Sequence, residues 1–474
     1  MPTIEQSTPP PDALPPEEGG ASGHPARVLN TRDATCVVVG AIIGVGIFFT
    51  PTQVIKQAGS AELAMLAWAL AGGIALCGAL TFAALGRLYH ASGAQYQILR
   101  DAYGTLPGFV FVFCNATVIQ PGAIAIIGII CAKHLGVAVT GVEPQGTGLI
   151  TLSALLIAAL ITANVVGVRW GSRIQNLTVY AKILTLLAIT AAAAFLAPDA
   201  EAIAARAADP AAATDGARLA VVGVMSGLVA CFFSYGGWQH ALWISGEVRE
   251  PRRTLPRAIV GGVVLVVIVY LLANWAYLRL LGTDGVANSE ALAADAARVA
   301  LPGYGARLIA GAVAVSAFGV LNAQFLSGPR LLYGLAKDGR FFPTFAGLHT
   351  RLGTPVAAIA LLGSFALVLL LVAGRNFNAV DRLLTGVVAV DSVFFGLTGA
   401  AVFVLARRAG REDRTLRALG YPVVPALFVI GELGVVAGSF MNASTRSAAA
   451  IGGAWIALAA VVYLVRFRRA ASTA

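Results

Sequence analysis

Residues 34–57 form an apolar stretch that is long enough to cross a bilayer, yet its centre is not composed like an unbroken helix. Gly44 and Gly46 lie one residue apart in the run GAIIGVGIF. Glycine weakens a helix, and backbone released from a helix inside lipid is tolerated only where it lines a cavity or binds something. The alternative is a continuous helix whose glycines allow close packing against a neighbour. The stretch therefore predicts either a binding site at mid-membrane or a closely packed helix.

A second apolar stretch, residues 219–247, repeats this feature. It contains the run FFSYGGW, in which Gly236 and Gly237 interrupt an otherwise apolar span. By hydropathy, the two interrupted stretches are the first and the sixth spans of the chain. Secondary transporters built from two inverted five-span repeats would carry their broken helices at these two positions. The second break therefore favours a binding site over close packing.

The composition of the 474 residues excludes a soluble domain, because 58% are hydrophobic and only 12% are charged. We therefore expect an all-α polytopic membrane protein. The net charge of +10 does not require a nucleic-acid partner, because positive charge in membrane proteins mostly marks the cytoplasmic loops. The five cysteines form no CxxC pair, no metal-ligand spacing is present, and no phosphate-binding loop precedes a Lys-Ser or Lys-Thr pair. We expect no cofactor, no metal and no enzymatic activity.

Hydropathy predicts twelve spans, each near or above the ~20 residues that a bilayer requires. They cover residues 34–57, 61–86, 104–134, 147–167, 174–197, 219–246, 255–281, 304–333, 354–374, 380–407, 420–440 and 446–466.

An even number of spans places both termini on one side, and the positive charges indicate which side. Most of the 33 Lys and Arg residues lie in the loops on the N-terminal side, so both termini are expected in the cytoplasm. Residues 1–29 are proline-rich, lack the apolar core of a signal peptide, and are expected to be a disordered cytoplasmic tail. The external loop 282–303 is expected to form a short amphipathic helix over the outer mouth.

The broken spans and three further motifs together resemble the amino acid–polyamine–organocation superfamily, and more narrowly its L-type amino acid transporter branch. The three motifs are GVRWGSRIQN at 167–176, GEVREPRRTLPRAI at 246–259 and SGPRLLYGLAKDG at 327–339. The resemblance implies a LeuT-like fold, with one five-helix repeat in residues 30–200 and an inverted copy in 201–415. Residues 416–474 would add two helices and a short cytoplasmic tail. It implies a permease of the inner membrane.

Physical argument and resemblance agree on how such a site would hold an α-amino acid. A half-helix N-terminus offers free amides to a carboxylate, and a half-helix C-terminus offers carbonyls to an ammonium group. In similar transporters these backbone groups clamp the substrate, although Val45 stands where the L-type branch often has a small hydroxyl residue. The expected contacts are the amides of Gly44, Val45 and Gly46 and the carbonyls near Ile42, Ile43, Phe233, Ser234 and Gly236.

Lys182 lies within the fifth span and has no acidic residue within one helical turn. A charge in an apolar span is costly, and such residues usually mark function. Desolvation favours the neutral form of a lysine, which is compatible with proton transfer. In similar transporters this lysine replaces the sodium ion of sodium-coupled relatives and touches the break in span 1. The alternative is a side chain that reaches back to the cytoplasmic interface.

Other residues carry weaker expectations. By resemblance, Phe233 is the aromatic gate on the external side. Asn322 is expected either to face the site or to bond a neighbouring helix, and Asp391 is a functional candidate without an assigned role. Core packing is expected for Tyr235 and Trp238, pairing with local arginines for Glu247, and helix bonding for His240.

These features predict a secondary transporter of α-amino acids that works by alternating access, as a proton symporter or an exchanger. Because no carboxylate was evident at the site, neutral substrates are favoured. The alternatives are a transporter of amines, polyamines or cationic amino acids, and an amino acid receptor that does not transport. The expected partners are the substrate, lipid and possible coupling protons, whereas the oligomeric state cannot be predicted.

Overall fold

The computed structural model describes residues 25–195, 216–300, 303, 305–375, 377–409, 416, 420–441 and 443–468. Within these residues the chain forms helices and no strand; the one extended pairing is a parallel bridge between Leu29 and Val248. Most of the expected tail 1–29 and of the loop 198–218 lies outside the described residues. Leu29, near the end of that tail, is 1% exposed.

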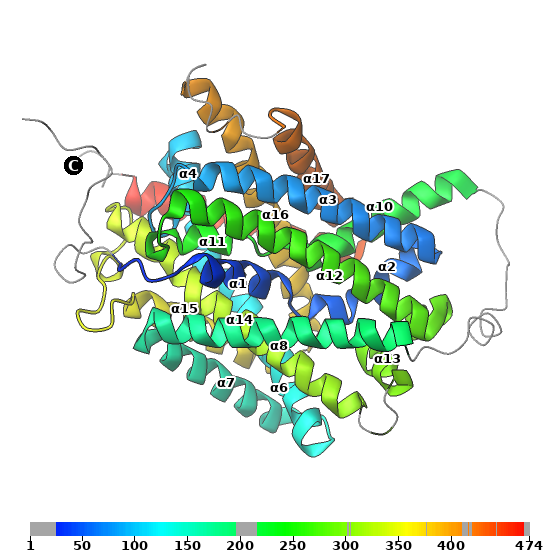
Figure 1. Cartoon of the computed structure of the whole chain (residues 1–474). Helices are drawn as coiled ribbons and strands as arrows, with labels where there is room; N and C mark the ends of the chain where they lie inside the picture. Colours follow the sequence, from blue (N-terminus) through cyan, green and yellow to red (C-terminus); the bar gives the residue numbers. More distant parts are fainter. Residues whose placement is uncertain are drawn as a thin grey trace, which may run out of the picture.

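The helices run side by side along one axis, which lies horizontally in Figure 1. Nine segments of the described chain are long and apolar enough to cross a membrane, and two shorter apolar segments accompany them. The chain is therefore an all-α polytopic membrane protein. All twelve predicted spans fall on helical segments, whereas their arrangement as inverted repeats remains a prediction. The nine segments are Ala61–Gly86, Thr105–Thr140, Gly146–Val166, Val168–Phe195, Pro251–Asn288, Gly305–Lys337, Ala389–Arg408, Val423–Phe440 and Arg446–Phe467.

The helices bear the labels of Figure 1. Up to residue 195 they are α1 (Thr31–Ile42), η1 (Gly46–Phe48), α2 (Thr50–Ala58), α3 (Ala61–Gly86), α4 (Ala94–Tyr103), α5 (Thr105–Cys114), η2 (Asn115–Ile119), α6 (Gln120–Thr140), α7 (Gly146–Val166) and α8 (Val168–Phe195). From residue 216 they are α10 (Gly216–Tyr235), α11 (His240–Trp243), η3 (Ser245–Glu247), α12 (Pro251–Asn288), α13 (Leu292–Ala300), α14 (Gly305–Lys337), η4 (Pro343–Phe345), α15 (Val356–Arg375), α16 (Phe377–Arg408), α17 (Val423–Met441), α18 (Ala443–Val462) and η5 (Tyr463–Phe467).

The first predicted span is broken where its glycines lie. Asn30 caps α1 by accepting a hydrogen bond from the amide of Asp33, and the helix ends at Ile42. The chain then passes through one short 3-10 turn before α2 begins at Thr50 with a proline in its first turn. Span 1 therefore consists of two half-helices, as its sequence predicted.

The sixth predicted span is broken between α10 and α11, and this break lies directly against the first. Gly237 has a φ of +134°, which a residue with a side chain rarely adopts. A Cβ atom on Gly237 would lie 2.7 Å from the carbonyl carbon of Ala41. Glycine is therefore required here for two reasons, backbone conformation and close approach of the two half-helix ends.

Helix α14 is the central helix of the bundle. Of its apolar window 72% is buried, the largest share among the nine spanning segments. It packs against α1, α6 and α8. The approach to α8 is close at Gly319, where a Cβ would lie 2.5 Å from the hydroxyl of Thr178. The approach of α8 to α1 is closer still at Gly40, where a Cβ would lie 1.8 Å from the side-chain nitrogen of Gln175. These glycines allow three helices to meet at the break in span 1.

Two further local features of the bundle are a π-helical turn and a short helix after α12. A π-helical turn, Asn115–Ile119, joins α5 to α6 and ends two residues before Pro121, whose ring nitrogen has no hydrogen to donate. The short helix predicted within residues 282–303 is present as α13, after Gly282 interrupts α12. The first described residues and the last described turn, η5, lie at the same end of the bundle, at the left in Figure 1.

Candidate substrate site

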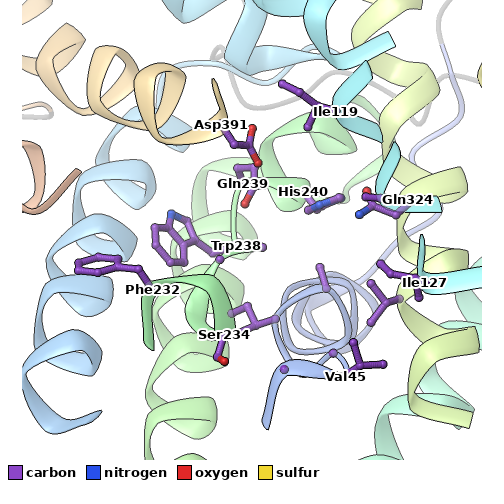
Figure 2. Close-up of a pocket in the computed structure, with 18 of the residues that line it drawn as sticks. Val45, Ile119, Ile127, Phe232, Ser234, Trp238, Gln239, His240, Gln324 and Asp391 are labelled. Carbon is purple, nitrogen blue, oxygen red and sulfur yellow. The ribbon is translucent and has the colours of Figure 1, made fainter. Parts of the chain in front are cut away.

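A cavity of about 180 Å³ lies where the two broken spans meet α6, α14, α16 and α17. It is smaller than the roughly 300–1,000 Å³ of pockets for drug-sized ligands, so it suits a small solute. Figure 2 shows Val45 and Ser234 at one end, Asp391 at the other, and Trp238, Gln239, His240 and Gln324 between them. The predicted residues Ile42, Gly44, Val45, Gly46, Ser234, Gly236 and Asp391 line the cavity.

Backbone amides at the first break are free to bind an anion. The amides of Val45 and Gly46 have no hydrogen-bond partner within the described residues. The amide of Gly44, by contrast, donates to the carbonyl of Ile42 at 2.7 Å. Two of the three predicted amides are therefore available to a carboxylate, and both belong to residues that line the cavity.

Backbone carbonyls at the breaks only partly match the prediction. The carbonyl of Ile42 accepts bonds from Gly44 and Tyr270, and that of Ile43 accepts bonds from Lys182 and Ser316. The expectation that these two carbonyls are free for an ammonium group was wrong, because side chains from three other helices occupy them. Within the described residues, the unpartnered carbonyls that line the cavity at the breaks include those of Ala41 and Gly236.

Tyr270 of α12 joins the two breaks. Its hydroxyl lies 3.0 Å from the carbonyl of Ile42 and 3.1 Å from the carbonyl of Ser234, so the two carbonyls share its single hydrogen. The side chain is fully buried and packs against Trp68 and Tyr235. One hydroxyl thus fixes the carbonyl end of both half-helices, and with them the free amides and carbonyls that face the cavity.

Replacing Tyr270 with Phe is expected to reduce the initial rate of substrate uptake about tenfold. The change removes one hydroxyl and leaves two buried carbonyls without that donor, which costs about 1–3 kcal/mol. Tyr277→Phe is the matched control, since Tyr277 is on the same helix, is equally buried, and its hydroxyl has no partner within the described chain. Equal uptake rates for the two variants, measured in liposomes, would contradict a role of Tyr270 at the breaks.

Lys182 of α8 contacts the broken end of α1 and does not line the cavity. Its ammonium group donates to the carbonyls of Gly40 at 3.1 Å, Ile43 at 2.6 Å and Ser316 at 3.3 Å. The side chain is 1% exposed, so it does not extend to the interface. Within the described residues it forms no ion pair, and its charge is therefore met by backbone oxygens from α1 and α14.

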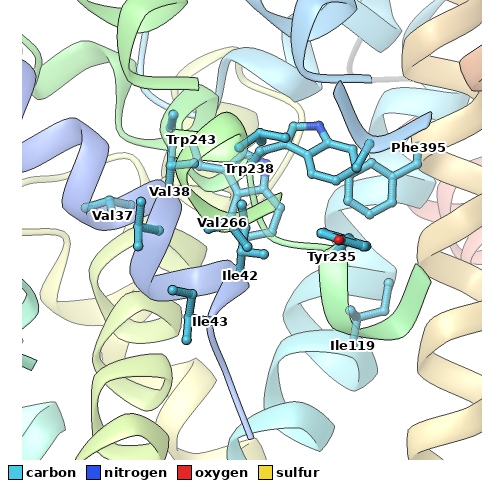
Figure 3. Close-up of a cluster of buried hydrophobic side chains, with 14 of the residues drawn as sticks. Val37, Val38, Ile42, Ile43, Ile119, Tyr235, Trp238, Trp243, Val266 and Phe395 are labelled. Carbon is cyan, nitrogen blue, oxygen red and sulfur yellow. The ribbon is translucent and has the colours of Figure 1, made fainter. Parts of the chain in front are cut away.

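Aromatic rings form one wall of the cavity. Trp238 packs on Phe82, Phe395 and Phe428, with ring centroids 5.4–6.2 Å apart. Figure 3 shows the rings of Trp238 and Phe395 next to each other. Tyr235 is a packing residue, as predicted. The side chain of Phe233, the expected gate, lies outside the described part of the structure.

Two polar residues predicted near the site bond to neighbouring helices. Asn322 does not line the cavity; its amide donates to the carbonyl of Gly171 and to Gln175, and it accepts a bond from Asn164. His240 lines the cavity, but its ring nitrogen Nδ1 is hydrogen-bonded to Ser327 of α14. Of the two alternatives for Asn322, helix bonding is the one the structure contains.

Glu247 pairs with a distant residue. The expectation of a partner among the nearby arginines was wrong, because the carboxylate binds Arg330 of α14 at 3.0 Å. The two side chains are 2% and 1% exposed, respectively. Its backbone carbonyl also accepts bonds from the amides of Val28 and Leu29, which attaches the N-terminal segment to the same point.

Two carboxyl groups line the cavity, and this overturns the premise that no carboxylate is near the site. Asp391 of α16 is partly buried, and Glu432 of α17 is 3% exposed. Ser392, the residue after Asp391, also lines the cavity. Asp391 was expected to be functional without an assigned role. Glu432 was not predicted, although an acidic residue within the apolar span 420–440 is itself a signal. Tyr270 and Ser316 had no comparable signal, because Tyr and Ser are common in spans.

The structure is that of a polytopic membrane protein with a cavity between two broken helices, an arrangement found in secondary transporters. Comparison with known sequences agrees. The amino acid permease family matches residues 29–466, so the chain belongs to that family and is a transporter rather than an enzyme.

Three relatives illustrate the similarity. The serine/threonine exchanger SteT of Bacillus subtilis is 28% identical over 418 residues, covering 87% of this chain and 91% of the relative. The human large neutral amino acids transporter small subunit 2 is 29% identical, covering 87% and 76%. The mouse b(0,+)-type amino acid transporter 1 is 28% identical, covering 83% and 77%.

Proposed function

We propose that this protein exchanges α-amino acids, neutral ones among them, across the cytoplasmic membrane by alternating access. One observation carries the proposal. The amides of Val45 and Gly46 and the carbonyls of Ala41 and Gly236, all without partners in the described chain, line one cavity. The amides bind the α-carboxylate and the carbonyls bind the α-ammonium group. Backbone recognition of this kind leaves the substrate's side chain free to vary.

Exchange is favoured over proton symport by the position of Lys182. Its ammonium group occupies a site formed by three backbone carbonyls, which is where a bound cation would otherwise link the substrate to the helices. A resident cation stabilises the broken end of α1 without an ion gradient. The serine/threonine exchanger among the relatives is consistent with this mode.

The proposal includes the overall arrangement. The twelve spans form two inverted five-helix repeats, residues 30–200 and 201–415, followed by two helices within 416–474. Both termini face the cytoplasm, since the positively charged loops lie on their side. Phe233 closes the external side of the cavity, and lipid surrounds the bundle.

Purified protein in liposomes tests the function. Labelled leucine and serine are offered to liposomes that are empty or preloaded with unlabelled amino acid, with and without an inward proton gradient. We expect uptake only into preloaded liposomes, and no response to the gradient. Uptake into empty liposomes that follows the gradient would replace exchange by symport. Saturable binding of an amino acid without any uptake would instead indicate a receptor.

A further inference from the structure

The end of the cavity away from the broken helices is strongly acidic. Asp391 and Glu432 both line it, and neither carboxyl forms an ion pair within the described residues. No Lys or Arg is among the described residues that line the cavity. Lys182 does not line it and binds carbonyls beyond the break instead, and the ring of His240 is bonded to Ser327.

A neutral side chain provides no partner for this acidic end. Carboxylates removed from bulk water are costly unless a cation or several donors meet them. Ser392 follows Asp391 in the chain and also lines the cavity, but its hydroxyl carries no charge that could balance either carboxylate. The described residues therefore supply no cation to balance Asp391 and Glu432.

An amide oxygen without a hydrogen-bond partner indicates which kind of ligand group this end of the cavity would bind. Gln239 is 4% exposed, lines the cavity, and its side-chain oxygen Oε1 has no hydrogen-bond partner in the described chain. In Figure 2 this side chain lies beside Asp391. Gln324, across the cavity, also has an unpartnered Oε1. Carboxylates and amide oxygens together accept hydrogen bonds and attract positive charge, so this end is suited to a group that only donates.

We propose that Asp391, Glu432 and Gln239 form a second subsite that binds the side-chain ammonium group of the substrate. The inference rests on the proposed function and names its substrate class: amino acids whose side chain ends in an alkylammonium group. The break residues hold the α-carboxylate and α-ammonium at one end of the cavity. The acidic residues of α16 and α17 hold the second ammonium at the other end.

Competition between matched compounds tests this subsite. Uptake of labelled leucine into preloaded liposomes is measured against unlabelled lysine, norleucine and cadaverine. Norleucine is lysine without the side-chain ammonium, and cadaverine is lysine without the carboxylate. We expect lysine to compete at a concentration at least about tenfold lower than norleucine, because a desolvated charge pair contributes strongly to affinity. Cadaverine as effective as lysine would identify the occupant as a diamine, which keeps the alkylammonium subsite.

Variants assign the preference to the acidic residues. The lysine-to-norleucine ratio is the preference for lysine, given by the competing concentration of norleucine divided by that of lysine. We expect Asp391→Asn and Glu432→Gln each to lower this ratio to near one. The matched control is Asp284→Asn, because Asp284 is an exposed acidic residue of α12, and it is expected to keep the wild-type ratio. If the two acidic variants do not fold, Gln239→Leu removes an acceptor without removing a charge and is expected to lower the ratio severalfold.

The outcomes that overturn the inference differ from those that overturn the function. Equal competition by lysine and norleucine in the wild-type protein, or a ratio unchanged in all folded variants, would eliminate the subsite while exchange stands. A wild-type protein that shows proton-driven uptake and no preference for lysine, and that loses this uptake in Glu432→Gln, would assign the carboxyls to proton transfer instead. Failure of every amino acid to exchange would eliminate both proposals.

Discussion

Replacing Lys182 with Met is expected to reduce the initial rate of amino acid exchange at least about hundredfold. The change removes a charged donor from the carbonyls of Gly40, Ile43 and Ser316 while keeping an unbranched side chain of similar length. A hydrogen bond from a charged group contributes about 1.5–3 kcal/mol, and each 1.4 kcal/mol is about tenfold in rate or affinity. The loss of two such bonds already accounts for the expected effect. Exchange into preloaded liposomes measures it.

Two further variants separate charge from hydrogen bonding. Lys182→Gln keeps a donor but not the charge; activity close to that of Lys182→Met would show that the positive charge itself is required. Lys56→Met is the control, because Lys56 is an exposed lysine of α2. A folded Lys182→Met protein with exchange near the wild-type rate would contradict any role of this lysine at the break.

The sequence predicted the elements of the fold well because membrane spans are constrained by few physical rules. Apolar length located the spans, and paired glycines located both breaks, since an interrupted helix inside lipid needs both flexible backbone and a cavity. Lys182 could be predicted for a similar reason. A single charge in an apolar span must find partners, and its contact with the break at Ile43 agrees with the resemblance.

What the sequence could not predict depends on contacts between distant helices. Nothing in the sequence indicated that the hydroxyl of Tyr270 would occupy the carbonyl of Ile42, a residue 228 positions away. Asp391 was evident as a buried acid, but its position at the cavity depends on how α16 packs. Glu432 carried the same signal and was missed, which led to the wrong premise that the site lacks carboxylates.

The pairing of Glu247 with Arg330 provides the second large effect. Arg330→Met is expected to lower the free energy of unfolding by about 3–5 kcal/mol, because it leaves a buried carboxylate without its cation. The double variant Glu247→Gln with Arg330→Met is expected to recover most of that loss, since no unpaired charge then remains. Unfolding of the detergent-solubilised protein by increasing amounts of sodium dodecyl sulfate measures both changes.

An exposed pair in the same region gives the comparison. Arg253 and Glu250 lie 3.9 Å apart and are each 77% exposed, so Arg253→Met is expected to change the free energy of unfolding by at most about 1 kcal/mol. Equal losses for Arg330→Met and Arg253→Met would contradict the importance of burial.

Because Glu247 also accepts bonds from the backbone of Val28 and Leu29, its pair with Arg330 connects α14, η3 and the N-terminal segment. If the cavity opens toward the end of the bundle where this pair lies, Glu247 and Arg330 must first separate. A double variant that is stable but exchanges faster than the wild-type protein would therefore identify the pair as part of the barrier to opening.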